Sequence, residues 1–245
     1  MWIVNSMKIN RNRIWWRITL SLFFTLHSSL LTLSCTQDAY DKGEGKYSLM
    51  RADFVEANSN AQKEIDRITT DDGDILSASK PFKVKFVNTP DSVYRCVLYY
   101  NKVKDEKSQD VFEPISIGQV ACPKIVTLAE LDKEMKTDPV KFESAWMSKS
   151  GKYINMSLYL MTGTSDDEEA KHTLRIVQDT IVTNPDATRT SFLRLYHDQG
   201  GVPEYYSTQV YFSIMTPDIP ADSVRIRIST YKGMTEKAFL LNAKK

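Results

Sequence analysis

Apolar and polar residues alternate along most of the chain beyond residue 46, a pattern typical of half-buried strands whose side chains point in turn to opposite faces. The segment 82–87 reads Phe-Lys-Val-Lys-Phe-Val, in which apolar residues alternate with lysines. Clusters such as Asp71-Asp72-Gly73-Asp74 interrupt the pattern and predict turns. About five short strands separated by such turns favour a small β-barrel over 47–124. The strand segments are 47–55, 65–69, 75–76, 82–87, 93–100 and 111–120.

The same alternation returns beyond residue 146 and continues almost to the C-terminus. Turn-prone clusters of Gly, Pro, Asn and Asp separate the apolar segments, as in Asn184-Pro185-Asp186. Several short strands with this punctuation predict an antiparallel β-sandwich over 140–242, so we expect an all-β protein. The strand segments are 153–161, 172–178, 192–197, 205–215, 224–231 and 238–241.

The stretch between these two regions has a different period. Apolar residues recur at helical spacing, at Leu128, Leu131 and Met135. Thr127 is placed as an N-cap, and Glu130, three residues later, completes the pattern of a capping box. The sequence therefore predicts one short helix in a connector over 125–139, ending before Pro139.

The N-terminal residues 1–35 have the pattern of a secretory signal. Basic residues precede an apolar run from Ile18 to Leu33, which is followed by Ser34 and Cys35. A cysteine directly after a small residue can be acylated on its thiol after cleavage. Thr32 stands where a lipoprotein signal usually has an aliphatic residue. We predict a lipoprotein signal peptide over 1–34, lipid attachment at Cys35 and a flexible polar tether over 35–46.

Two other interpretations of this segment remain open. The chain could be an ordinary secreted protein, or the apolar run could be an uncleaved anchor. A run of 16 residues broken by Ser, Thr and His is short for a membrane span, which needs about 20 predominantly apolar residues.

Charge changes the list of expected partners. Residues 1–34 hold four of the 32 basic residues and none of the 31 acidic ones, so the remainder has a net charge of −3. Nucleic-acid binding usually requires a clustered basic face. We therefore expect no nucleic-acid partner.

Cys96 and Cys122 are the two cysteines that remain once Cys35 is set aside. In an oxidising compartment they could form a disulfide, closing a loop of about 26 residues and adding about 3 kcal/mol of stability. The alternative is two buried free thiols that behave as small apolar side chains.

The residues that usually support catalysis or metal binding are sparse. His172 and His197 lie on different predicted strands, with no second ligand at a recognisable spacing. A calcium loop starting at Asp71 fails because its twelfth position is Phe82 rather than Glu. We therefore expect no metal, no cofactor and no enzymatic activity.

Three short motifs indicate modification instead. Asp followed by Ser or Thr and an apolar residue resembles the O-glycosylation acceptor of some exported bacterial proteins, with Ser92, Thr180 and Ser223 as the candidate acceptors. Entry into a strand explains the same pattern without modification.

The aromatic residues also allow two interpretations. They could form a platform for carbohydrate, or they could fill the core, since aromatic side chains are common in strands. They are Trp146, Tyr153, Tyr159, Tyr196, Tyr205, Tyr206 and Tyr211.

Three segments together resemble the NigD-like family of Bacteroidota lipoproteins. They are Tyr47–Phe54 with the Thr-Asp-Asp-Gly-Asp at 70–74, Trp146 with Ser150–Met156, and Phe192–Asp198 with Tyr205-Tyr206 and Phe212–Ile214. The resemblance implies an N-terminal OB-like barrel followed by a C-terminal β-sandwich. It defines no catalytic residues.

The resemblance also implies a role connected with bacteriocin immunity. We therefore expect a non-enzymatic lipoprotein held in the cell envelope, at the outer membrane, by its lipid anchor. Its partner would be a bacteriocin or other protein toxin. A glycan- or surface-polymer-binding protein and a structural component of a surface complex are the alternatives.

Overall fold

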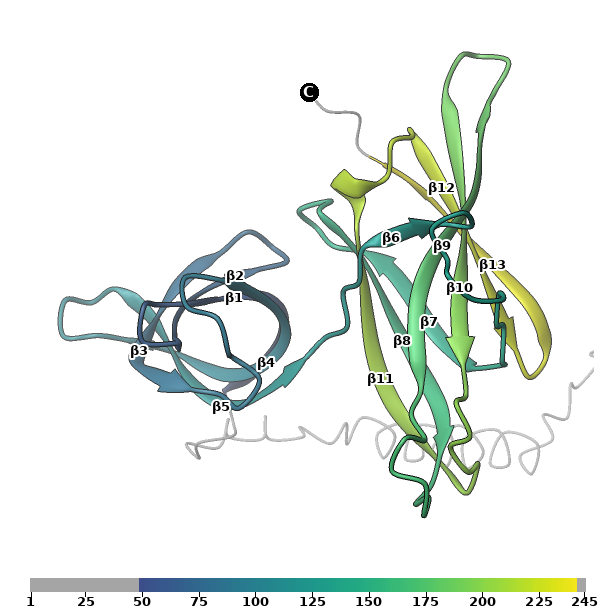
Figure 1. Cartoon of the computed structure of the whole chain (residues 1–245). Coiled ribbons are helices and arrows are strands. Elements are labelled where there is room, and N and C mark those ends of the chain that lie inside the picture. The colour runs from purple at the N-terminus through teal and green to yellow at the C-terminus, as the bar shows by residue number, and fades with distance from the viewer. Residues whose placement is uncertain (1–48, 242–245) are drawn as a thin grey trace, which may run out of the picture. The chain divides into compact units, whose positions relative to one another are not determined.

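The computed structural model describes residues 49–241, and these contain thirteen strands and a single 3₁₀ turn, Thr216–Asp218 (Figure 1). The predicted signal peptide, the tether and Cys35 lie outside the described residues. The all-β class expected from the alternating pattern is confirmed. Within residues 49–241, no helix is long and apolar enough to cross a membrane.

The first five strands form a closed barrel in the order β1-β2-β3-β5-β4 (Figure 1). Strand β1 closes it by pairing antiparallel with β4, while β3 and β5 pair in parallel. Such a five-stranded Greek-key barrel is OB-like, as expected. The strands are β1 (Met50–Ser59), β2 (Glu64–Thr70), β3 (Ile75–Lys83), β4 (Val93–Lys104) and β5 (Asp110–Gln119).

The other eight strands form two facing sheets. One sheet has the order β13-β12-β10-β9-β6 and the other the order β11-β8-β7. The strands are β6 (Ile125–Thr127), β7 (Lys141–Met147), β8 (Tyr153–Thr162), β9 (Thr173–Thr183), β10 (Arg189–Asp198), β11 (Tyr206–Met215), β12 (Ser223–Thr230) and β13 (Gly233–Leu240).

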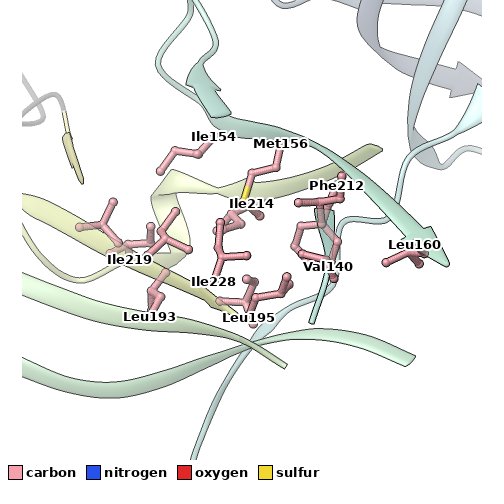
Figure 2. Close-up of a cluster of buried hydrophobic side chains, with 14 residues drawn as sticks. Val140, Ile154, Met156, Leu160, Leu193, Leu195, Phe212, Ile214, Ile219 and Ile228 are labelled. Atoms are coloured by element: carbon pink, nitrogen blue, oxygen red, sulfur yellow. The ribbon is translucent and has the colours of Figure 1, made fainter. Parts of the chain in front are cut away.

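Fully buried aliphatic and aromatic side chains from both sheets fill the space between them, and Figure 2 shows Leu193 and Leu195 facing Ile214 and Met156. In β8 the residues with even numbers supply this core, because every second side chain of a strand points to the same face. The core extends over the sandwich alone; the barrel has a separate core around Leu98, Tyr100 and Phe112.

The sandwich is not purely antiparallel. Strand β12 pairs in parallel with β10, and β6 pairs in parallel with β9. The chain leaves β10, crosses to the other sheet as β11 and returns as β12, so β10 and β12 run in the same direction.

The prediction of a connecting helix over 125–139 is wrong. Residues Ile125–Thr127 instead form β6, which extends the five-stranded sheet. The capping box does form, since the Thr127 amide donates to Glu130 Oε2 at 2.7 Å and the Glu130 amide donates to Thr127 Oγ1 at 3.3 Å. It stabilises one turn only. The chain beyond it is held in extended form by a bridge between Thr137 and His197.

Candidate binding site

A groove of about 520 Å³ lies in the sandwich, between β7, β8 and β11 of one sheet and the β12–β13 hairpin of the other. We call it the sandwich groove. None of its nine lining residues is a carboxylate or a histidine. They are Val140, Lys141, Phe142, Met161, Ser207, Thr230, Tyr231, Lys232 and Thr235.

Two local features position the sandwich groove. The Val140 amide donates to the Ser229 carbonyl at 3.0 Å, which ties the start of β7 to the end of β12. The hairpin turn is closed by Thr230 Oγ1, which donates to the Gly233 carbonyl at 2.6 Å. Gly233 has φ of +105°, a conformation that other residues rarely adopt. The turn therefore holds Tyr231 at the side of the groove.

Lysines surround the groove from both sheets. Lys141 belongs to β7, and its Nζ lies 4.8 Å from the centre of the Tyr159 ring. Lys237 belongs to β13, and its Nζ lies 5.2 Å from the centre of the Phe142 ring. Lys232 is exposed in the hairpin turn. Lysines and apolar side chains thus both occur in and beside the groove.

Carboxylates lie close to this region as well, and one of them is Glu143, whose pKa is lowered by a hydrogen bond from Ser157 and also by the charge of Lys141. Burial raises the pKa of Tyr231, and the negative charges of Glu204 and Asp138 raise it further. Asp138 already accepts a hydrogen bond from the Gln199 amide at 2.7 Å. Glu236, on β13, pairs with Arg225 and Arg227.

One large apolar side chain of the lining is exposed. Tyr231, in the turn between β12 and β13, is 49% exposed. Exposed apolar groups rimmed by polar residues commonly mark interaction sites. The groove is thus a candidate surface for binding another protein.

A second cavity, of about 380 Å³, lies where the barrel meets the sandwich. Arg95 of β4 is its buried charge, with a side chain only 4% exposed. Its Nη2 donates to Asp71 Oδ2 at 2.7 Å and to Asn155 Oδ1 at 3.0 Å. Its Nε donates to Ser213 Oγ at 3.3 Å, and its Cζ lies 3.8 Å from the centre of the Tyr153 ring. These contacts join β4 to β8 and β11.

Glu56 adds a second group of polar contacts at this junction. Tyr153 donates its hydroxyl hydrogen to Glu56 Oε1 at 2.6 Å, and Lys152 pairs with the same oxygen. Burial alone would raise the pKa of Glu56, but the hydrogen bonds from Lys152 and Tyr153 outweigh it and leave the pKa lowered. The ionised groups at the junction therefore have partners within the protein, which favours a structural role for this cavity.

A third hollow, of about 430 Å³, lies on the barrel and has a purely polar lining. We call it the barrel hollow. Asp66, Arg67 and Ser77, on β2 and β3, contribute to it together with residues near the end of β1 and the start of β4. Amide, carboxylate and guanidinium groups of this kind can hydrogen-bond sugar hydroxyls.

The two histidines, which the sequence placed on different strands with no recognisable common site, lie side by side. His172 Nδ1 is 3.1 Å from His197 Nε2, and the rings are stacked. His197 Nδ1 is 2.9 Å from the Asp138 carbonyl oxygen, so this nitrogen must donate. His197 Nε2 is then the acceptor, and His172 Nδ1 donates to it. No cluster of three or more metal-binding side chains occurs in residues 49–241.

The candidate disulfide is not formed, and Cys96 and Cys122 are free thiols. Cys96 belongs to the barrel core, where burial raises the pKa of its thiol to about 12. Cys122 lines the junction cavity beside Arg95. Because neighbouring residues of a strand point to opposite faces, Cys96 and Arg95 point away from each other. The two thiols are therefore separated by the barrel wall.

The three candidate glycosylation sites differ in exposure. Thr180 is exposed on β9. The Ser92 hydroxyl donates to the Pro90 carbonyl at 2.9 Å, and the Ser223 hydroxyl shares a hydrogen bond of 2.9 Å with Thr190. Modification of all three stays a prediction, and exposure favours Thr180.

The aromatic residues that the sequence suggested as a platform are divided among different environments. Trp146 and Tyr211 both pack edge-on against Phe54 of the barrel, with ring centres 5.4 and 5.2 Å apart. Tyr196 is only 2% exposed. Tyr205 is 77% exposed and directly precedes β11. No single aromatic surface results from these residues.

The sandwich groove was not found from the sequence. Its lining comes from four places that are distant in sequence, 140–142, Met161, Ser207 and 230–235, and only the folded sheets bring them together. The one local signal is Tyr231-Lys232-Gly233, where an aromatic residue and a lysine occupy a tight turn.

Comparisons with solved structures show the same fold. A NigD-like immunity protein from Bacteroides caccae superposes with a TM-score of 0.59 and 21% identity, covering 78% of this chain and 96% of that one. A candidate toxin-related protein from Parabacteroides distasonis gives 0.57 and 16%, covering 78% and 92%. A candidate lipoprotein from Bacteroides fragilis gives 0.57 and 14%, covering 80% and 99%. No curated protein matches the sequence.

A family model defines the C-terminal half more closely. Residues 124–240 match the NigD-like C-terminal beta sandwich domain. The match begins one residue before β6 and ends with the last residue of β13, so it covers all eight strands of the sandwich. Together with the likeness to the Bacteroides caccae structure, this confirms the resemblance seen in the sequence: the chain carries a NigD-like C-terminal β-sandwich domain.

Proposed function

We propose that this protein is a lipid-anchored component of the cell envelope that acts by binding another protein, and that its role resembles bacteriocin immunity. The observation that carries the proposal is the sandwich groove, whose lining includes the apolar Val140 and Phe142 and the exposed ring of Tyr231. Binding sites for proteins typically combine an apolar centre with a polar rim.

The groove favours binding over catalysis. Its titratable lining groups are two lysines and one tyrosine, and the lining holds no histidine or carboxylate that could act as a general base. The nearby histidine pair is engaged within itself, because His197 also bonds the Asp138 carbonyl.

The related structures also support a binding role at the cell envelope. One is an immunity protein, one a candidate toxin-related protein and one a candidate lipoprotein. Their identity to this chain is 21% or less, so the comparison carries the fold, and the immunity role is a proposal for this chain.

Deletion of the gene followed by challenge with bacteriocin-producing strains tests the immunity role. We expect the deletion strain to become sensitive to at least one producer and the full-length gene to restore resistance. Thr235→Trp, which places a large ring in the sandwich groove, should fail to restore it. Ser77→Trp, which fills the barrel hollow instead, is the matched control and should restore it. Unchanged sensitivity of the deletion strain would refute the immunity role.

The barrel hollow favours a second function, the binding of a glycan or surface polymer. Its lining is entirely polar, and OB-like barrels can bind oligosaccharides on the face formed by β2 and β3. A glycan array probed with the full-length protein should then give hits that Ser77→Trp removes and Thr235→Trp leaves unchanged. An array without hits would exclude this alternative for the glycans tested.

A further inference from the structure

We propose that the loop between β8 and β9, residues 163–172, is held closed at neutral pH by His172 and opens as the pH falls. We call this segment the β8–β9 loop. His172 is its last residue, and the His172 ring stacks on the ring of His197 in β10, with ring centres 5.3 Å apart and planes inclined by 23°. The loop is thus fixed at one end by a group that changes its charge in mild acid.

The hydrogen bonds of the histidine pair leave no favourable place for a further proton. His197 Nδ1 donates to the Asp138 carbonyl, so His197 Nε2 accepts from His172 Nδ1. A proton on His197 Nε2 would set one N–H against another. A proton on His172 Nε2 would lie on a buried nitrogen that has no hydrogen-bond partner within residues 49–241. Either position is unfavourable while the loop is closed, and water satisfies the proton once the His172 ring is exposed.

Charged groups around the pair do not reverse this preference. The Met161 carbonyl and the negative charge of Glu204, in the loop between β10 and β11, both favour a charged His172 ring. Burial and the neighbouring His197 outweigh them, so the pKa of His172 is lowered. The other charged or titratable residues around the pair are Lys136 and Asp138 before β7, Asp198 at the end of β10, Lys171 in the β8–β9 loop and Tyr231 in the β12–β13 turn.

Acid therefore favours the open loop. In the open loop the His172 ring is in water and has the ordinary histidine pKa of about 6.5. The closed loop binds this proton less readily, so its advantage is fully present above pH 6.5 and is lost as the pH falls toward the lowered pKa. In that range the equilibrium between closed and open loop shifts by up to about tenfold per pH unit.

Little else holds the β8–β9 loop in place. The hydrogen bonds of residues 163–171 stay within the loop, as between the Ala170 amide and the Asp167 carbonyl at 3.1 Å, and none of them reaches another segment of residues 49–241. Residues 166–169 are all exposed. Segments with few contacts to the remainder of a protein open at a low cost in free energy.

The surface against which this loop closes is held much more firmly. The Gln199 side chain donates to the carbonyls of Met161 and Val202, both at 2.9 Å, and ties the start of the β10–β11 loop to the end of β8. The next residue, Gly200, is where the two loops approach most closely, since a Cβ there would lie 2.1 Å from the Lys171 carbonyl oxygen. Both loops lie at the same end of the sandwich (Figure 1). Opening therefore moves the β8–β9 loop away from Gly200 and frees the peptide bond between Lys171 and His172.

Trypsin cleavage after Lys171 measures this opening in the full-length protein purified from the envelope. The protease needs the open loop, because the Lys171 carbonyl packs on Gly200 when the loop is closed. Cleavage after Lys232, in the β12–β13 turn, reports opening elsewhere in the same sample. Each rate is divided by that of a synthetic peptide with the same local sequence at the same pH, which removes the pH dependence of the protease.

We expect the corrected rate at Lys171 to rise severalfold between pH 7.5 and pH 5.5, with an upper limit of about tenfold for one histidine of pKa 6.5 in the open loop. The corrected rate at Lys232 should stay the same. In His172→Asn the side chain still donates toward His197 but does not titrate, so its corrected rate at Lys171 should be equal at the two pH values. Circular dichroism checks that this variant is folded, and His172→Gln takes its place if it is not.

Three results would overturn the proposal. The corrected rate at Lys171 could be the same at pH 7.5 and pH 5.5, which would show that the loop does not respond to acid. It could rise equally at Lys171 and Lys232, which would assign the effect to unfolding of the whole sandwich. It could rise in His172→Asn as much as in the unsubstituted protein, which would assign the effect to groups other than His172.

Discussion

Arg95 keeps a full charge in a place where its side chain is only 4% exposed, and its partners come from both the barrel and the sandwich. Arg95→Leu would remove the opposite charge from the Asp71 carboxylate, which is 17% exposed and would keep only the side-chain amide of Asn155 as a donor, at 2.7 Å. Because removing one member of a buried ion pair leaves the other charge uncompensated, we expect a loss of about 3 kcal/mol in the free energy of unfolding. Urea denaturation measures it.

Arg67→Leu is the control for this change. Arg67 is an exposed arginine on β2, and its substitution should alter the free energy of unfolding by less than about 0.5 kcal/mol. Equal denaturation midpoints for the two variants would show that the Arg95 contacts contribute little to stability.

The histidine pair makes stability depend on pH. Burial and the neighbouring His197 lower the pKa of His172, so the folded protein binds a proton there less readily than the unfolded chain does. The stability from this group is fully present above the ordinary histidine pKa of about 6.5 and is lost as the pH falls through the lowered pKa. Thermal denaturation should therefore show a fall in melting temperature between pH 7 and pH 5.

His172→Asn isolates this contribution. Asparagine can still donate a hydrogen bond toward His197 but does not titrate. We expect the variant to lose less stability than the unsubstituted protein between pH 7 and pH 5. A fall of the same size in both proteins would assign the pH dependence to other groups.

Gly200 and Gly201 show how one backbone position can control the loop between β10 and β11. Both have positive φ, +58° and +76°. A Cβ on Gly200 would lie 2.1 Å from the Lys171 carbonyl oxygen, whereas one on Gly201 would meet nothing within 4 Å. Gly201→Ala should therefore cost only the conformational penalty, about 1 kcal/mol. Gly200→Ala should cost at least twice as much, because backbone must also move. Chemical denaturation of both variants compares them, and similar losses would contradict the close approach.

Most strands of both domains can be predicted from the alternation of apolar and polar residues. Where the predicted strands differ from the observed ones, the cause can be identified. The segment 82–87 alternates cleanly, yet β3 ends at Lys83, because Val84 and Phe86 pack against the barrel core from a turn rather than a ladder. Strand β6 lies inside the predicted helical connector and β7 is missing from the predicted strands, because the capping box between them stabilises only a single turn. Local signals specify a turn, while pairing with a distant strand decides whether a helix continues.

The candidate site was far less predictable than the fold. The groove depends on register: Val140 bridges Thr230, and Ser207 pairs with Met161. Pairings between residues so far apart in sequence cannot be deduced from the alternation of either strand. The histidine pair is a similar case, because His197 and Leu174 are paired residues of β10 and β9 and this register brings the His172 ring to His197.

For the whole molecule, location and binding are separate properties carried by separate parts of the chain. The sandwich groove belongs to residues 140–235, whereas the predicted anchor is Cys35. A protein that intercepts a toxin at the envelope must be held there, because tethering raises its effective concentration at the membrane without changing any contact. Anchoring and binding should therefore be separable by mutation.

Cys35→Ala tests this separation. It removes the thiol that would be acylated and leaves every described residue unchanged. We expect labelling with radioactive palmitate to be lost and the protein to leave the membrane fraction, while its circular dichroism spectrum stays the same. Protection against a bacteriocin should fall, because the binding domain would no longer be concentrated where the toxin arrives. Equal palmitate labelling of Cys35→Ala and the unsubstituted protein would refute the anchor, and full protection by an unlabelled protein would show that binding alone is sufficient.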